Sequence, residues 1–119
     1  MADLILTRDH IRATTVNGTD VFDAEGEHIG HIDDIILSKT QGKAIYAILS
    51  FGGFLGLGGR YHPLPWRSLK YDEGLDGYVV NLSREQLEGA PNYRHGGDPD
   101  WNDPVFEQRL ASYYGFPYL

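Results

Sequence analysis

Residues 20–70 read DVFDAEGEHIGHIDDIILSKTQGKAIYAILSFGGFLGLGGRYHPLPWRSLK, in which short apolar runs alternate with glycine-marked polar turns. The apolar runs are rich in β-branched and aromatic residues, which favour strands. No helix-length segment interrupts them, and the turns follow one another at close spacing. This pattern predicts a mainly β domain, a small and nearly closed antiparallel barrel.

Six strands are expected in this domain. In the longest of them the apolar residues are Ile29, Ile32, Ile35 and Leu37, so strict alternation breaks between the first two. We expect Gly30 to lie at a bulge that restores the inward register of this set. The strand at 44–51 is nearly all apolar, which is typical of a central strand covered on both faces. The expected strands cover residues 20–22, 28–37, 44–51, 60–64, 69–71 and 78–82.

Turn and edge residues complete this interpretation. Gly26 closes a polar tetrapeptide at 23–26 that suits a type I turn. Pro63 and Pro65 cannot donate backbone hydrogen bonds, so they confine their strand to an edge or an end of the sheet. Trp66 is expected to pack in the core or at its rim.

A short helix is expected directly after the last strand. Ser83 can accept from the Gln86 amide while the Gln86 side chain returns to Ser83, which is a capping box. Gly89 and Pro91 then end the helix. The helix is interpreted as a seal on the barrel.

A second helix should begin at Asp103, with a proline at its first position, and end at Gly115. It carries an apolar stripe that must dock on the barrel or on a second copy of the chain. The aromatic residues that follow are equally unsuited to water. The proposed contact residues of this helix and tail are Phe106, Leu110, Tyr113, Tyr114, Phe116 and Tyr118.

Length and composition indicate one domain. The chain has 119 residues, of which 41% are hydrophobic, and it divides into a lead-in (1–16), a barrel (17–91) and a linker with an aromatic helix and tail (92–119). The absence of cysteine excludes disulfides and thiol nucleophiles. No apolar run is long enough for a signal peptide or a membrane span, so a cytoplasmic location is expected.

The net charge is −7, and the ten Lys and Arg residues are scattered along the chain. Affinity for phosphate backbones requires clustered cations, so direct binding of nucleic acid is not expected.

Four motifs together closely resemble the PRC-barrel family. They are GEHIGHIDD at 26–34, GKAIYA at 42–47, FGGFLGLG at 51–58 and PW at 65–66. The resemblance implies the barrel fold and a binding or scaffolding module, because relatives dock onto other macromolecules and share no catalytic residues. Two such relatives are the cytoplasmic domain of the photosynthetic reaction centre H subunit and the C-terminal domain of a ribosome maturation factor. This chain lacks the membrane helix of the first and the N-terminal domain of the second, so neither role transfers.

The glycine segment 52–59 matches neither a dinucleotide fingerprint nor a P-loop, because a strand follows it. Gly52 and Gly53 are interpreted as structural residues of a wide hairpin. The large apolar residues of this loop either form a contact surface or fold back as a plug of the barrel. These residues are Phe54, Leu55 and Leu57.

Candidate metal and catalytic residues do not assemble in the sequence. His28 and His31 are three apart on a strand and point to opposite faces unless a bulge intervenes. The adjacent carboxylates Asp33 and Asp34 diverge for the same reason. His62 and His95 lie in other segments, so no catalytic residue, metal site or cofactor is expected.

We therefore expect a non-catalytic interaction or scaffold module that forms a homodimer and binds an unidentified protein. The alternatives left open are an accessory factor in RNA metabolism or ribosome maturation, and an enzyme of unknown class.

Overall fold

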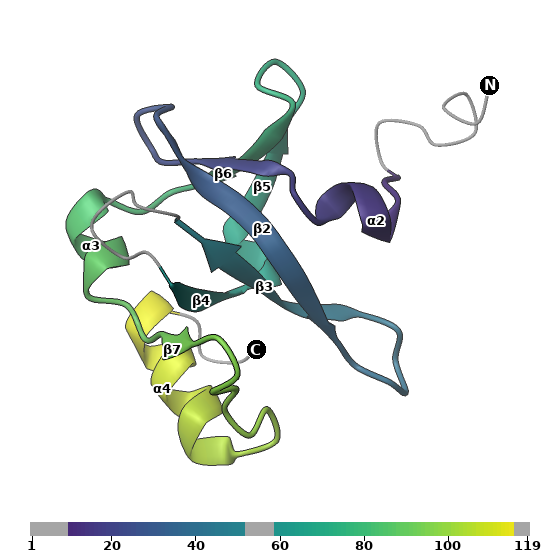
Figure 1. Ribbon diagram of the computed structural model, residues 1–119, viewed down its shortest axis with the longest axis vertical. Coiled ribbons are helices and arrows are strands. Elements are labelled where there is room, and N and C mark those ends of the chain that lie inside the picture. The colour runs from purple at the N-terminus through teal and green to yellow at the C-terminus, as the bar shows by residue number, and fades with distance from the viewer. Residues whose placement is uncertain (1–9, 52–58, 116–119) are drawn as a thin grey trace.

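The computed structural model describes residues 10–51 and 59–115. Seven strands form one sheet in the order β5-β6-β1-β2-β3-β4-β7 (Figure 1). All neighbours are antiparallel except β1 and β6, which are parallel. The mainly β prediction is confirmed. The strands are β1 (Asp20–Phe22), β2 (His28–Leu37), β3 (Ala44–Ser50), β4 (Arg60–Pro65), β5 (Leu69–Asp72), β6 (Gly77–Val80) and β7 (Tyr93–Arg94).

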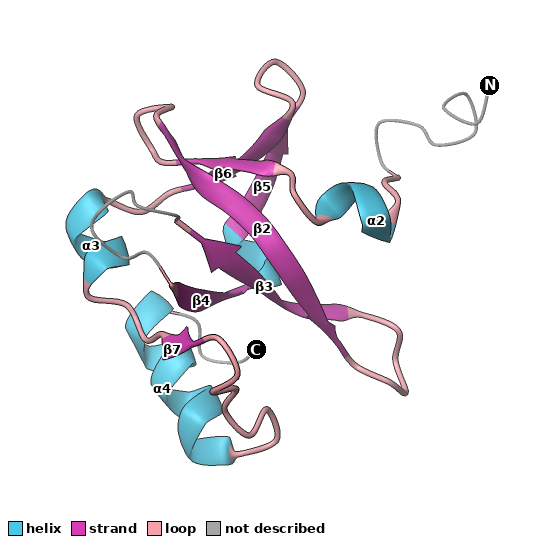
Figure 2. Cartoon of the chain, in the orientation of Figure 1, coloured by secondary structure: helices cyan, strands magenta, loops and turns pink. Residues whose placement is uncertain are grey.

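Short helices precede, connect and follow the strands of the sheet (Figure 2). They are α2 (Ala13–Val16), the 3₁₀ turn η2 (Trp66–Ser68), α3 (Arg84–Glu88) and α4 (Pro104–Tyr114). None of the helices within the described ranges has the length and hydropathy of a membrane span.

The register of β2 is irregular beside Gly30. Val21 pairs with Gly30 and Phe22 pairs with His28, so Ile29 is an extra residue between the two pairs. The expected bulge therefore lies next to Gly30. A second irregularity, between Ile32 and Asp34, adds another unpaired residue.

The expectation that Leu37 faces inward is wrong, because this side chain is 57% exposed. Each extra residue in a strand moves every following side chain to the other face. The extra residue Asp33 leaves Ile35 against the inner cluster and Ile36 against the outer one. The irregularity at Leu37 adds Ile45 to β3 and no residue to β2, and Leu37 is the last residue of its strand. Ile36 is half-buried instead.

Two clusters of buried side chains lie on opposite faces of β3, as expected of a covered central strand. Ala47 and Leu49 belong to the cluster inside the barrel. Tyr46 and Ile48 belong to an outer cluster that includes Leu110 of α4. The outer face of the sheet is thus covered by the C-terminal helix.

Both predicted helices have the predicted ends. Ser83 and Gln86 form the capping box of α3. The Asp103 side chain accepts from the Val105 amide at the start of α4, and Gly115 ends it in the left-handed conformation with a φ of 79°. Glycine tolerates this conformation without a steric cost.

The segment 92–103 differs from the expected linker. It contains β7, which pairs with Arg60 and Tyr61 of β4. It also contains Trp101, which packs in the outer cluster with Tyr93. Burial of these two aromatic rings offsets the conformational entropy of ordering a polar, glycine-rich segment.

Candidate interaction site

A hollow of about 390 Å³ lies between α2 and the β5–β6 hairpin. We call it the α2 hollow. It draws on three parts of the fold: the segment around α2, the start of β1, and the hairpin. Its lining residues are Ile11, Thr14, Thr15, Asn17, Gly18, Thr19, Asp20, Tyr71 and Asp76.

The parallel pairing of β1 with β6 brings these parts together. Val21 pairs with Tyr78, and Gly77 lies where β6 begins. A Cβ atom at Gly77 would stand 2.5 Å from the backbone oxygen of Asp20 and 2.8 Å from the Phe22 ring. Only glycine permits this approach. The hairpin consequently lies beside the start of β1.

Two backbone hydrogen bonds fix the other wall. The Gly18 amide donates to the Ile32 carbonyl at 2.6 Å, and the Ile32 amide donates to the Thr19 carbonyl at 2.9 Å. The Thr19 hydroxyl donates to the Thr15 carbonyl at 2.5 Å. These bonds hold the segment after α2 against β2.

Each carboxylate of the hollow is oriented through one oxygen. Asp20 Oδ1 lies 3.0 Å from His28 Nε2. Asp76 Oδ1 accepts from the Tyr71 hydroxyl at 2.5 Å. This hydrogen bond is the main reason why the pKa of Tyr71 is raised to about 12, and the charges of Asp76 and Glu73 add to the effect. The hollow therefore presents two carboxylates and, among its described lining residues, no lysine or arginine.

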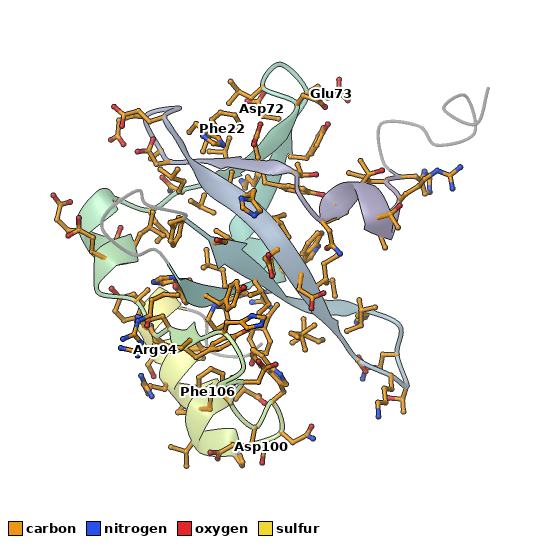
Figure 3. All side chains as sticks on the ribbon, in the orientation of Figure 1. Phe22, Asp72, Glu73, Arg94, Asp100 and Phe106 are labelled. Atoms are coloured by element: carbon orange, nitrogen blue, oxygen red, sulfur yellow. The ribbon has the colours of Figure 1, made fainter. Side chains whose placement is uncertain are left out.

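Exposed apolar side chains gather at the same place. Ile11 and Tyr71, which line the hollow, are 38% and 41% exposed, and Leu75, next to Asp76, is 40% exposed. Figure 3 shows the neighbouring Asp72 and Glu73 at the hairpin turn, far from Phe106 on α4. Sequence reasoning missed this site. The Asp76–Gly77 dipeptide was its clearest available signal, since it marks a turn.

The candidate metal and acid residues do not converge. His28 Nε2 lies 3.0 Å from Asp20 Oδ1, whereas the backbone of His31 pairs with Asp20 of β1 and with Ser50 of β3. Asp33 and Asp34 are exposed. Over residues 10–51 and 59–115 no three His, Cys, Asp or Glu side chains are grouped to hold a metal.

His62 and His95 have separate surroundings. His62 is fully buried, and its ring stands edge-on to Phe51 at 4.8 Å between ring centres. Neither of its ring nitrogens has a hydrogen-bond partner in the described part of the chain. His95 Nδ1 lies 3.2 Å from the Tyr61 hydroxyl on the outer face.

The predicted contact residues of α4 are largely used within the chain. Leu110 is fully buried in the outer cluster. Phe106 and Tyr114 are half-buried against the same cluster. Tyr113 is 39% exposed, and its hydroxyl donates to the Gln86 carbonyl of α3.

Sequence reasoning also missed the aromatic network of the outer face. The Trp101 ring lies 5.6 Å from Tyr46, 5.8 Å from Tyr93 and 5.8 Å from Phe106, measured between ring centres. Burial raises the pKa of Tyr93, and the charge of Asp98 raises it further. A tryptophan within a polar segment was the available signal.

Trp66 packs against the inner cluster, with its ring edge-on to Tyr78 at 5.6 Å between ring centres. Gly26 has a φ of 82° in the turn after β1. The other predicted residues lie outside the described residues. They are Gly52, Gly53, Phe54, Leu55, Leu57, Phe116 and Tyr118.

Most of the sheet and α2 fall within a match to a known domain family. The family model of the PRC-barrel domain matches residues 8–87. The match begins before α2 and ends within α3, so it includes the whole α2 hollow and excludes β7 and α4. A comparison with curated proteins found no match. Because the matched residues make up more than half of the chain, it belongs to the PRC-barrel domain family.

Proposed function

We propose that this chain is a non-catalytic interaction module that binds a protein partner through the α2 hollow and its apolar rim. The observation that carries the proposal is that the exposed side chains of Ile11 and Tyr71 line one hollow, while the exposed Leu75 directly precedes its lining residue Asp76. Exposed large apolar side chains that gather in one place mark protein contact sites, whereas scattered ones need no explanation.

The module is also proposed to form a homodimer through α4. Leu110 faces its own sheet and contributes nothing to a partner. Val105 and Tyr113 remain 73% and 39% exposed on the same helix. A two-fold contact would cover these side chains with their counterparts. The two surfaces lie at different ends of the fold, so a dimer leaves the hollow accessible to another protein.

A capture experiment with matched variants tests the partner proposal. The intact chain and the double variant Ile11→Ser/Leu75→Ser are immobilised and exposed to native lysate. Leu37→Ser is the control, because it removes an exposed leucine that does not line the hollow. We expect the double variant to lose a protein that the intact chain and the control retain. Equal capture by all three would contradict the proposal, and recovery of ribosomal proteins by all three would favour the accessory factor in ribosome maturation.

A further inference from the structure

The charge of the α2 hollow is one-sided. Its acidic side chains are Asp20, whose Oδ1 lies 3.0 Å from His28 Nε2, and Asp76, and none of the described residues that line it is lysine or arginine. The neighbouring turn adds Asp72 and Glu73. A chain with a net charge of −7 leaves this excess uncompensated over longer distances.

The two carboxylates come from independent elements. Asp20 begins β1 and Asp76 lies in the turn before β6. Asp76 has a φ of 53°, which is uncommon for a residue other than glycine and points its side chain to the Tyr71 hydroxyl. Two carboxylates that line one hollow favour the approach of a cation to it.

The uncharged lining residues of the hollow can contact the non-charged part of a lysine or arginine side chain. The Tyr71 ring is an aromatic surface for a cation, and the Thr14 and Thr15 side chains supply hydroxyl oxygens that accept hydrogen bonds. The exposed Ile11 and Leu75 can cover apolar neighbours of that side chain.

We infer that the α2 hollow receives a lysine or arginine side chain from a protein segment whose flanking residues are apolar. The inference rests on the proposed function, because it names the chemistry of the partner at the same site. A metal ion is the competing occupant, but the described residues offer no group of three ligands for one.

Peptide binding followed by amide chemical shifts tests the inference on the intact chain. The probes are acetyl-Ser-Leu-Arg-Leu-Ser-amide, the same peptide with citrulline in place of arginine, and magnesium chloride alone. Citrulline keeps the shape of arginine without its charge. We expect the arginine peptide to shift the amides of Gly18, Tyr71 and Asp76 saturably and to bind about tenfold more tightly than the citrulline peptide, as one charge-assisted contact implies.

Two variants that each remove one negative charge distinguish binding at the hollow from nonspecific attraction of the peptide to an acidic protein. Asp76→Asn should weaken the arginine peptide about tenfold. Asparagine tolerates a positive φ and keeps an oxygen for the Tyr71 hydroxyl, so the fold is preserved. Asp33→Asn removes the same charge from the exposed part of β2 and should leave binding unchanged.

Four results would overturn the inference: equal binding of the arginine and citrulline peptides, equal weakening by both variants, absence of shifts at the hollow, or saturable shifts with magnesium alone. The proposed function fails separately. A captured partner that is lost with Ile11→Ser/Leu75→Ser but retained with Asp76→Asn would support the proposed protein contact at the hollow. The same result would contradict the inference that a lysine or arginine side chain binds there.

Discussion

The backbone oxygen of Ser50 occupies the space that a side chain at Gly30 would need. A Cβ atom there would also stand 3.0 Å from Phe51 Cα. Because both neighbours are tied to the backbone of β3, they cannot move aside without breaking the β2–β3 pairing. Gly30 is thus required by close packing, whereas the sequence suggested only a bulge.

Gly30→Ala should lower the free energy of unfolding by roughly 1 to 3 kcal/mol, the usual cost of forcing extra atoms into a packed interior. Urea unfolding measures this change. Gly74→Ala is the matched control, since its nearest neighbour is the Asp72 side-chain oxygen at 3.2 Å, which can shift. Equal stability of the two variants would show that β2 and β3 lie further apart.

Burial lowers the pKa of His62 from 6.5 to about 4, and the nearby charge of Arg60 adds to the shift. The folded state therefore resists protonation, while the unfolded state gains a proton below pH 6.5. The contribution of His62 to stability is complete above that pH, and about 3 kcal/mol is lost as the pH falls to 4.

Unfolding of the wild type and of His62→Leu from pH 4 to pH 7 tests this linkage. The carboxylates titrate in both proteins, so the difference between the two curves isolates His62. The wild type should lose more stability on acidification than the variant. Parallel curves would mean that His62 is hydrated or hydrogen-bonded in solution.

Trp101→Ala should destabilise the chain by roughly 2 kcal/mol, because the half-buried ring contacts Tyr46, Tyr93 and Phe106. Leu37→Ala, at an exposed position that is 57% accessible, should change stability by less than about 0.5 kcal/mol. Thermal unfolding of both variants provides the comparison. A neutral Trp101→Ala would indicate that the outer cluster does not stabilise the fold.

Sequence reasoning succeeded where structure is set locally. The capping box of Ser83 and Gln86 and the stop at Gly115 involve residues close in the chain, so their positions could be predicted to within one residue. The long apolar runs identified β2 and β3 for a similar reason.

The remainder depends on contacts between distant segments. The parallel pairing of Val21 with Tyr78 leaves no trace in local periodicity, and it creates the α2 hollow. The extra residues Ile29 and Asp33 of β2 and Ile45 of β3 are defined only by pairing with the neighbouring strands, so alternation alone cannot count them. The two-residue β7 is too short to carry a pattern, so Trp101 could not be placed.

Binding to nucleic acid should be undetectable at physiological salt. The net charge of −7 opposes approach to a phosphate backbone, and no cluster of Lys or Arg is available in the sequence to release counterions. Fluorescence anisotropy with a labelled single-stranded RNA and a DNA duplex measures this. Micromolar affinity for either would contradict the prediction and favour the RNA-related alternative.

Light scattering on the intact chain tests the proposed homodimer. Truncation after Pro91 is unsuitable, because it would remove β7, Trp101 and α4 and uncover Tyr46 and Ile48. Val105→Asp is preferable: the side chain is 73% exposed, so the monomer fold tolerates a charge there, whereas a two-fold contact would bury two like charges.

We expect the intact chain to have the mass of a dimer, Val105→Asp that of a monomer, and both to unfold at similar temperatures when compared at high dilution. The matched control Leu37→Asp introduces the same charge at an exposed leucine of β2 and should remain a dimer. A dimer in all three proteins would place the interface away from α4. A monomeric intact chain would remove the homodimer and leave the α2 hollow as the proposed interaction surface, because its lining residues belong to one chain.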